Sequence, residues 1–264
     1  MSVEVPEAPD VEIAPSAEQY NARLVRRVDF TESLAVFTIR YEEEPRPFEP
    51  GQYMTIGVVA NGKIVQRPYS VASAPAEVED GYEMYVRLVD GGKFTPLLWR
   101  LPVGHEMRMI GPKGRFVLGE ERERTHLFVC SGTGNAPFLS MVRQMLADGV
   151  ERDVVFLMGV SYVEDLGYRE LVEGWEREGA FPIRFVPTVS RPNDPANAGW
   201  EGRTGRVETI IDPVCDELGL NADNTVAYIC GNPEMIVTAE ELLEARGFSP
   251  GHIRTEQYWP KKRQ

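Results

Sequence analysis

The chain has 264 residues, of which 42% are hydrophobic and 26% charged, and its formal net charge is −13. This composition is that of a globular protein, and the length favours two domains. The negative charge argues against general nucleic-acid binding, and no apolar run approaches the ~20 residues that span a bilayer. Because the first residues lack the basic and apolar parts of a secretory signal, we expect a cytoplasmic protein that acts away from membranes.

The first segment, residues 1–18, is acidic and proline-containing. Its acidic residues are Glu4, Glu7, Asp10, Glu12 and Glu18, and it has no Lys or Arg. Such a segment buries too little apolar surface to fold, so it is predicted to be a disordered leader.

The cysteines and histidines are scattered along the chain. Cys130, Cys215 and Cys230 lack the spacing of an iron–sulfur motif, and the histidines lack metal-ligand spacing. We therefore expect no metal site, and any redox centre must be an organic cofactor.

Residues 19–118 have the pattern of short strands separated by turns. The expected strands are Ala22–Val28, Leu34–Arg40, Gln52–Val59, Arg67–Ser73, Tyr82–Val89 and Glu106–Ile110. Asn61-Gly62 is a strong hairpin signal, and another turn is expected at 111–114. The pattern predicts a small antiparallel β-barrel, with a short helix over Thr95–Leu101.

Residues 125–264 alternate strands and helices after a charged break at 119–124. The expected strands are His126–Cys130, Val154–Met158, Ile183–Val189, Val226–Cys230 and Ile253–Trp259. Between them, helices are expected after Pro137 and over Asp165–Glu178, Arg206–Leu218 and Met235–Arg246. This alternation of strands and helices predicts a doubly wound α/β domain with a parallel sheet.

Two motifs in the first domain have residue types that suit a phosphate-bearing aromatic cofactor. In Arg67-Pro68-Tyr69-Ser70, the arginine can pair with a pyrophosphate and the tyrosine ring can stack on a cofactor ring. In Gly91-Gly92-Lys93-Phe94-Thr95, glycines before a helix expose N–H groups that favour a phosphate. Each motif taken alone also fits a purely structural role, the second as a turn with a threonine N-cap.

Two further motifs lie at strand-to-helix junctions of the second domain. Residues 132–137, Gly-Thr-Gly-Asn-Ala-Pro, follow a buried strand, as a dinucleotide-binding loop requires. Proline replaces the third glycine of the usual fingerprint, a substitution that suits the first turn of a helix. Residues 230–235, Cys-Gly-Asn-Pro-Glu-Met, share the same sheet edge, where ligands collect. Cys230 there can line a nicotinamide pocket or serve as a small buried hydrophobe.

These four motifs, in this order, resemble the ferredoxin–NADP⁺ reductase superfamily, most closely its bacterial type. The resemblance covers about Tyr20 to Trp259. In that family an FAD-binding antiparallel β-barrel precedes an α/β domain that binds NADP(H), and the same two-domain fold is expected here.

The resemblance also implies roles for particular residues. Those implied to contact FAD are Arg67, Pro68, Tyr69, Ser70, Val86, Gly92, Lys93, Phe94, Thr95, Thr133, Tyr258 and Trp259. Those implied to be catalytic are Ser70, Cys230, Glu256 and Tyr258. Those implied to bind NADP(H) are Gly132, Thr133, Gly134, Asn135, Arg191, Arg206, Cys230, Gly231 and Met235.

Arg191 and Arg206 resemble the family's clamp for the adenosine 2′-phosphate, which favours NADPH over NADH. Some bacterial members have a further arginine where this chain has Ser161, so a weaker preference is expected.

The implied activity is hydride transfer between NADP(H) and FAD, followed by single-electron transfer between FAD and a ferredoxin or flavodoxin. One alternative is the NADH-dependent reductase component of an oxygenase, or a flavin reductase. A second is an FAD-bearing electron-transfer subunit of a larger complex.

Overall fold

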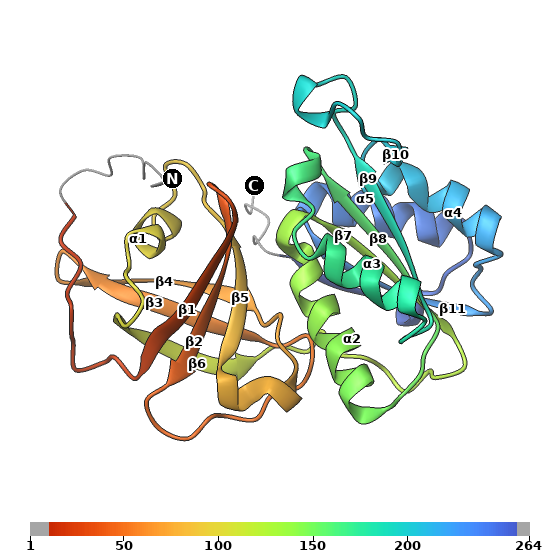
Figure 1. The fold of residues 1–264 in the computed structure, drawn as a ribbon. Coiled ribbons are helices and arrows are strands. Elements are labelled where there is room, and N and C mark those ends of the chain that lie inside the picture. Colours follow the sequence, from red (N-terminus) through yellow and green to blue (C-terminus); the bar gives the residue numbers. More distant parts are fainter. Residues whose placement is uncertain (1–10, 258–264) are drawn as a thin grey trace. The chain divides into compact units, whose positions relative to one another are not determined.

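A computed structural model describes residues 11–257 of the chain. Figure 1 shows the elements coloured along the sequence. The contacts divide the chain into two compact units. One contains the residues up to Val117 together with Leu139–Gln144, and the other contains Leu118–Phe138 and the residues from Met145 onward. Within the described residues, no helix has the length and apolar character to cross a membrane.

The first unit is built on an antiparallel sheet of six strands in the order β4-β3-β6-β1-β2-β5. The strands are β1 (Ala22–Thr31), β2 (Leu34–Tyr41), β3 (Tyr53–Ala60), β4 (Lys63–Ser70), β5 (Tyr82–Arg87) and β6 (Glu106–Lys113). A bridge between Val71 and Met84 joins the end of β4 to β5, so the two edges of the sheet meet. The predicted barrel is thereby confirmed. Besides the strands, the unit contains the 3-10 helix η1 (Pro75–Asp80) and the short helix α1 (Thr95–Trp99).

The barrel interior is filled by apolar side chains that alternate along the strands. Its fully buried members include Leu24, Phe37, Ile39, Met54, Ile56, Tyr82 and Met84. The β3–β4 hairpin turns at Asn61 and Gly62, whose φ values of 47° and 72° are those that a two-residue hairpin loop needs. The sequence placed a turn at 111–114, but β6 continues through Lys113, which pairs with Tyr53. An irregularity in the β3 register between Tyr53 and Thr55 accommodates this extension.

Part of the expected leader belongs to the barrel. Ile13 bridges Ala60, and the amide of Ala14 donates to the carbonyl of Val59 at 2.9 Å. Val11 and Ile13 pack against the barrel core. These two apolar side chains explain why this stretch is ordered despite its acidic surroundings. Residues 1–10 lie outside the described part of the chain.

The second unit contains a sheet in the order β10-β9-β8-β7-β11-β12, in which every pair is parallel. Its strands are β7 (Thr125–Ser131), β8 (Val154–Val160), β9 (Ile183–Val189), β10 (Arg203–Thr204), β11 (Thr225–Gly231) and β12 (Ile253–Gln257). The main helices are α2 (Ala136–Asp148), α3 (Arg169–Glu178), α4 (Ile211–Leu218) and α5 (Pro233–Ala245). The doubly wound parallel sheet predicted for this part of the chain is confirmed.

The two faces of this sheet are covered differently. On one face the Phe128 and Phe138 rings stack with centroids 4.5 Å apart, which packs the start of α2 against β7. On the other face Leu127 and Val129 join the apolar sides of α4 and α5, which include Ile236. Figure 1 shows α3 on one side of the sheet and α4 and α5 on the other. Every residue of β8 is buried, as expected for a central strand covered on both faces.

Several helix boundaries differ from those expected. The helix expected from Asp165 begins at Arg169, because Tyr168 adopts a φ of 65° that a helix cannot contain. The helix expected from Arg206 is replaced by a 3-10 turn, η5 (Val207–Ile210), followed by α4. Pro213 lacks an amide hydrogen and fits only the first turn of an α-helix, which places the start of α4 at Ile211.

A buried polar network lies at the amino-terminal edge of the parallel sheet. His126 is fully buried, with Nδ1 2.9 Å from the Arg124 carbonyl and Nε2 2.8 Å from Nη1 of Arg152. Its ring stacks on Tyr228 with an interplanar angle of 11°. The Arg152 guanidinium also donates to the carbonyl of Gly119 at 2.9 Å. His126 is therefore a structural residue of this edge.

Candidate functional site

In the first unit, the R-P-Y-S motif forms the end of β4. Arg67 is exposed, and its guanidinium donates a hydrogen bond to the neighbouring carbonyl of Gln66 at 2.7 Å. Tyr69 lies partly buried against the barrel core, and burial raises the pKa of its phenol. Ser70 is buried and pairs with Tyr53 on β3. The motif thus presents an exposed cation next to a neutral aromatic ring.

The G-G-K-F-T loop meets this motif through its aromatic residue. The rings of Tyr69 and Phe94 lie with centroids 6.0 Å apart and an interplanar angle of 41°. Thr95 is the first residue of α1 rather than its N-cap, and its hydroxyl accepts from the amide of Val89 at 3.0 Å. A Cβ at Gly92 would lie 2.8 Å from the Val89 carbonyl oxygen. The tight turn therefore requires glycine at this position.

The remaining residues expected at this site differ in exposure. Pro68 and Lys93 are exposed, so their side chains are accessible to a cofactor. Val86 on β5 is 1% exposed and belongs to the barrel core. Strand alternation points this side chain inward, and the role expected for Val86 at the cofactor stays a prediction.

In the second unit, the G-T-G-N-A-P and C-G-N-P-E-M motifs converge. Cys130 and Cys230 are register partners on the neighbouring strands β7 and β11, so both loops leave the same edge of the sheet. A Cβ at Gly134 would lie 2.3 Å from the carbonyl oxygen of Cys230 and 3.0 Å from Cα of Gly231. The two loops thus approach so closely that only glycine fits at 134.

A hydrogen bond also joins these two loops. The hydroxyl of Ser131, the last residue of β7, accepts from the amide of Asn232 at 3.0 Å. Gly231 has a φ of 141°, and a Cβ there would lie 2.5 Å from the Ser131 hydroxyl oxygen. The Asn232 side chain caps α5 by accepting from the amide of Glu234 at 2.8 Å. Sequence reasoning missed Ser131, although it directly precedes the glycine loop.

Two residues expected to bind the nucleotide point into the domain. Asn135 is 1% exposed, and its side-chain nitrogen donates to the Gly167 carbonyl at 3.4 Å. Met235 is 3% exposed and packs in the core beneath α5. Both side chains are buried near the start of a helix, and the roles expected for these two residues in nucleotide binding stay predictions. Of the other loop residues, Gly132 has a φ of 55°, and Thr133 is half-buried.

The expected catalytic residues of this unit lie on neighbouring strands. Cys230, the residue before the last of β11, is fully buried, and its register partner on β12 is Glu256, which is half-buried. The structure thus places this thiol-bearing residue and this carboxylate-bearing residue side by side at the loop edge of the sheet. Tyr258 and Trp259 lie outside the described residues, and the roles expected for them stay predictions.

The expected arginine clamp lies at the ends of β9 and β10. Val160, Val189 and Thr204 occupy matching positions at the ends of β8, β9 and β10. Arg191 and Arg206 each lie two residues beyond this row, in the segments that follow β9 and β10. Both are exposed, and Arg206 is 3.8 Å from the carboxylate of Glu208.

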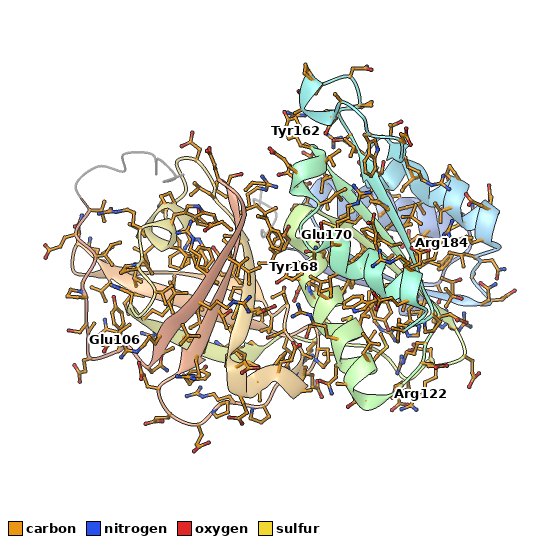
Figure 2. The ribbon with its side chains drawn as sticks, viewed as in Figure 1. Glu106, Arg122, Tyr162, Tyr168, Glu170 and Arg184 are labelled. Atoms are coloured by element: carbon orange, nitrogen blue, oxygen red, sulfur yellow. The ribbon has the colours of Figure 1, made fainter. Side chains whose placement is uncertain are left out.

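The side chain of Tyr162 pairs with Arg191. The guanidinium carbon of Arg191 is 5.1 Å from the centroid of the Tyr162 ring, and the guanidinium donates to the tyrosine hydroxyl. Figure 2 shows Tyr162 on the loop after β8, at a distance from Arg184 near the start of β9. This chain has Ser161 at the position where some bacterial members have a further arginine. The positive charge expected at this corner is therefore that of Arg191 and Arg206. Sequence reasoning did not single out Tyr162, for which the signal was an aromatic residue two positions after a buried strand.

Comparison with known proteins assigns both units. Residues 21–118 match the oxidoreductase FAD-binding domain, and residues 128–241 match the oxidoreductase NAD-binding domain. The chain is 32% identical over 246 residues to ferredoxin–NADP reductase B of Sorangium cellulosum, covering 92% of this chain and 98% of that protein. The chain belongs to the ferredoxin–NADP⁺ reductase family.

Other members of the reductase family differ in their partners. The reductase component of the naphthalene 1,2-dioxygenase/salicylate 5-hydroxylase systems of a Ralstonia species is 31% identical, covering 98% of this chain and 74% of that protein. Among solved structures, ferredoxin NADP⁺ reductase of Neisseria gonorrhoeae has a TM-score of 0.77 at 24% identity, covering 92% of this chain and all of that one. The family assignment confirms the resemblance found in the sequence and makes this chain an FAD- and NAD(P)-binding oxidoreductase.

The barrel of this reductase fits the FAD that its family uses. Within residues 11–257, no carboxylate forms an ion pair with the exposed Arg67, which leaves its charge available for a phosphate. The ring of Tyr69 lies beside Phe94, and Gly92 keeps the turn before α1 free of a side chain. A cation can pair with the FAD pyrophosphate, an aromatic ring can stack on the isoalloxazine, and a glycine turn leaves room for a phosphate. Within the described residues, no group of His, Cys, Asp and Glu side chains is arranged to hold a metal ion.

Proposed function

We propose that this protein transfers electrons between NADP(H) and a ferredoxin or flavodoxin, with FAD as its redox cofactor. The observation that carries the proposal is the contact between the two glycine loops, where a Cβ at Gly134 would meet the Cys230 carbonyl at 2.3 Å. This contact builds a side-chain-free edge at the switch point of a parallel sheet, where nucleotides bind. It lies in the part of the chain that matches an NAD-binding domain.

The nucleotide loops have the shape that a pyrophosphate needs. Gly134 and Gly231 allow the two loops to pack in contact, and the Cβ position of Gly132 has no atom within 4 Å, so a phosphate can approach the start of α2 there. The Ser131–Asn232 hydrogen bond holds the second loop against the first. We assign Cys230 and Glu256 to the nicotinamide end, since they are register partners at this edge.

The barrel residues bind and orient the cofactor. We assign Arg67 to a phosphate of FAD and Tyr69 to stacking on its ring system, because one supplies an unpaired cation and the other a neutral aromatic face. When bound, FAD supplies the conversion between two-electron and one-electron transfer. Burial keeps the Tyr69 phenol protonated across the physiological range, so it contributes no charge next to the ring.

The preference for NADPH is assigned to the corner formed by Arg191 and Arg206. Each arginine can donate charge-assisted hydrogen bonds to a 2′-phosphate, which are worth about 1.5–3 kcal/mol. Arg191 is already held by Tyr162, so little side-chain freedom remains to be lost on binding.

A second candidate is the reductase component of an oxygenase. It is favoured by the 31% identical Ralstonia relative, whose name gives both nucleotides as ferredoxin–NAD(P)⁺. The Arg206–Glu208 pair offsets part of the positive charge at the clamp, which reduces discrimination against NADH. This alternative changes the partner and the nucleotide but not the chemistry of the site.

One experiment tests both proposals. The purified chain is loaded with FAD, and its visible spectrum is recorded without oxygen before and after NADPH or NADH is added. Turnover is then measured with ferricyanide, a ferredoxin and a flavodoxin. Bleaching by NADPH and transfer to a carrier protein are expected. A strong preference for NADH would favour the oxygenase component. If neither NADPH nor NADH bleached the flavin, the proposed activity would be contradicted.

A further inference from the structure

The loop between β9 and β10 contains one buried side chain. Over residues 191–206 every side chain is exposed or half-buried except that of Asn197, which is 2% exposed. Asn197 ends the 3-10 turn η4 (Pro195–Asn197). A polar side chain buried in an otherwise solvated loop is expected to form specific hydrogen bonds, because burial without partners is costly.

Asn197 forms three such bonds, and they join two loops. Its amide nitrogen donates to the carbonyls of Ser161 at 3.0 Å and of Arg191 at 2.8 Å. Its amide oxygen accepts from the N–H of Val163 at 2.8 Å. One side chain thus holds the main chain on either side of Tyr162 and the main chain of Arg191.

The two loops held by Asn197 carry the Tyr162–Arg191 pair. Both loops leave the sheet at the end of the β8–β9 register, where Val160 pairs with Val189. The relative position of the Arg191 guanidinium and the Tyr162 ring therefore depends on the spacing of two main-chain segments that Asn197 ties together. Strand pairing fixes the spacing only up to Ser190, whose amide donates to the Val160 carbonyl at 2.9 Å.

The other end of the loop is held separately. The indole N–H of Trp200 donates to the carbonyl of Arg203 at 2.8 Å, and the guanidinium carbon of Arg169 is 5.2 Å from the centroid of the Trp200 ring. Loss of the Asn197 bonds would therefore free the 161–163 and 191 segments while Trp200 still fastens the loop to the domain. Because the Trp200 contacts do not depend on Asn197, we expect loss of the Asn197 bonds to disturb only the positions of Tyr162 and Arg191.

We propose that Asn197 is a positioning residue for the adenosine half of the nicotinamide nucleotide, acting through Tyr162 and Arg191. This inference rests on the proposed function, since it assumes that the nucleotide extends from the glycine loops towards β9. The distance is suitable: β9 is two strands away from β7, about 10 Å across the sheet, which an extended dinucleotide can span.

The test uses Asn197→Asp, which keeps the acceptor for Val163 but replaces the donor to both carbonyls with an oxygen. Asn193→Asp is the matched control, because it adds the same charge to the same loop at an exposed position. Asn197→Ala serves as a second variant without added charge. Each FAD-loaded protein is assayed with NADPH and with reduced nicotinamide mononucleotide, which lacks the adenosine half.

For both Asn197 variants we expect the KM for NADPH to rise about tenfold or more while kcat stays within about twofold. Their kcat/KM for the mononucleotide should stay within about twofold, and Asn193→Asp should resemble the parent protein. An unchanged KM for NADPH, or an equal loss with both substrates, would overturn the inference. If the parent protein oxidised no nicotinamide nucleotide, the proposed function itself would fail, a result distinct from either of these.

Discussion

The carbonyl oxygen of Cys230 lies 2.3 Å from the position that a Cβ would occupy at Gly134. Gly134 belongs to the loop after β7, and Cys230 lies next to the last residue of the neighbouring strand β11. The obstacle is main chain, which cannot rotate away as a side chain can. Alanine at 134 must therefore push the two loops apart at the edge assigned to the nucleotide.

We predict that Gly134→Ala destabilises the protein by about 1–3 kcal/mol, the usual cost of overpacking, and raises the KM for NADPH about tenfold or more. Gly174→Ala on α3 is the control, because the nearest atom to its Cβ would be the end of the Arg177 side chain at 3.7 Å. In a helix this change should be neutral or stabilise by about 0.5–1 kcal/mol. Chemical unfolding and nucleotide kinetics measure both effects, and equal behaviour of the two variants would refute the steric argument.

Arg67 tests the cofactor assignment in the barrel. Replacing it with alanine should remove a charge-assisted hydrogen bond worth about 1.5–3 kcal/mol and weaken FAD binding about 10- to 150-fold. Arg40→Ala is the control, since Arg40 is an exposed arginine on β2 of the same unit. Titration of the apoprotein with FAD, followed by quenching of flavin fluorescence, gives both dissociation constants. A Kd for the Arg67 variant equal to that of the control would remove Arg67 from the site.

Local patterns predicted much of this architecture from the sequence. Alternating apolar residues gave most barrel strands, and Asn61-Gly62 gave the β3–β4 hairpin, whose positive φ values only a few residue types accept readily. The convergence of the loops at 132–137 and 230–235 followed from a general property of parallel sheets, whose strand ends share one edge. These features depend on neighbours in sequence or on topology, both of which are visible in the chain itself.

The remaining features depend on which way a side chain faces after packing. Asn135 and Met235 lie within recognisable motifs, yet helix rotation turns both inward. The two-residue strand β10 is too short to show a periodic pattern. Asn197 lies in a loop without periodic patterning, and only the folded chain shows that its side chain reaches the carbonyl of Ser161.

The arginine clamp predicts a change in nucleotide preference. Arg206→Ala should raise the KM for NADPH by about tenfold or more and leave the KM for NADH within about twofold, because only NADPH has the 2′-phosphate. Arg184→Ala is the control, an exposed arginine near the start of β9 that pairs with Glu176 at 3.2 Å. Steady-state kinetics with both nucleotides give the ratio, and a parallel rise in the two KM values would exclude a phosphate-specific role.

His126 makes the stability of the second unit depend on pH. Burial, reinforced by the Arg152 guanidinium, lowers the pKa of His126 to about 4, whereas an unfolded histidine titrates near about 6.5. The unfolded chain therefore takes up a proton first as the pH falls. The stabilisation by the neutral ring is complete above about pH 6.5, is lost progressively towards pH 4, and amounts to about 3 kcal/mol.

Guanidinium unfolding from about pH 4.5 to 7.5 measures this dependence. His126→Gln should be less stable than the parent at neutral pH, because the glutamine side chain cannot reproduce both the bond to the Arg124 carbonyl and the bond from Arg152. It should also lose less stability on acidification, since no buried base remains to be protonated. His252→Gln is the control, because His252 is half-buried and its ring Nδ1 lies 3.3 Å from the hydroxyl of Ser249. If His126→Gln kept the parent's slope, the acid sensitivity would have to come from the carboxylates, and this account of the buried network would be wrong.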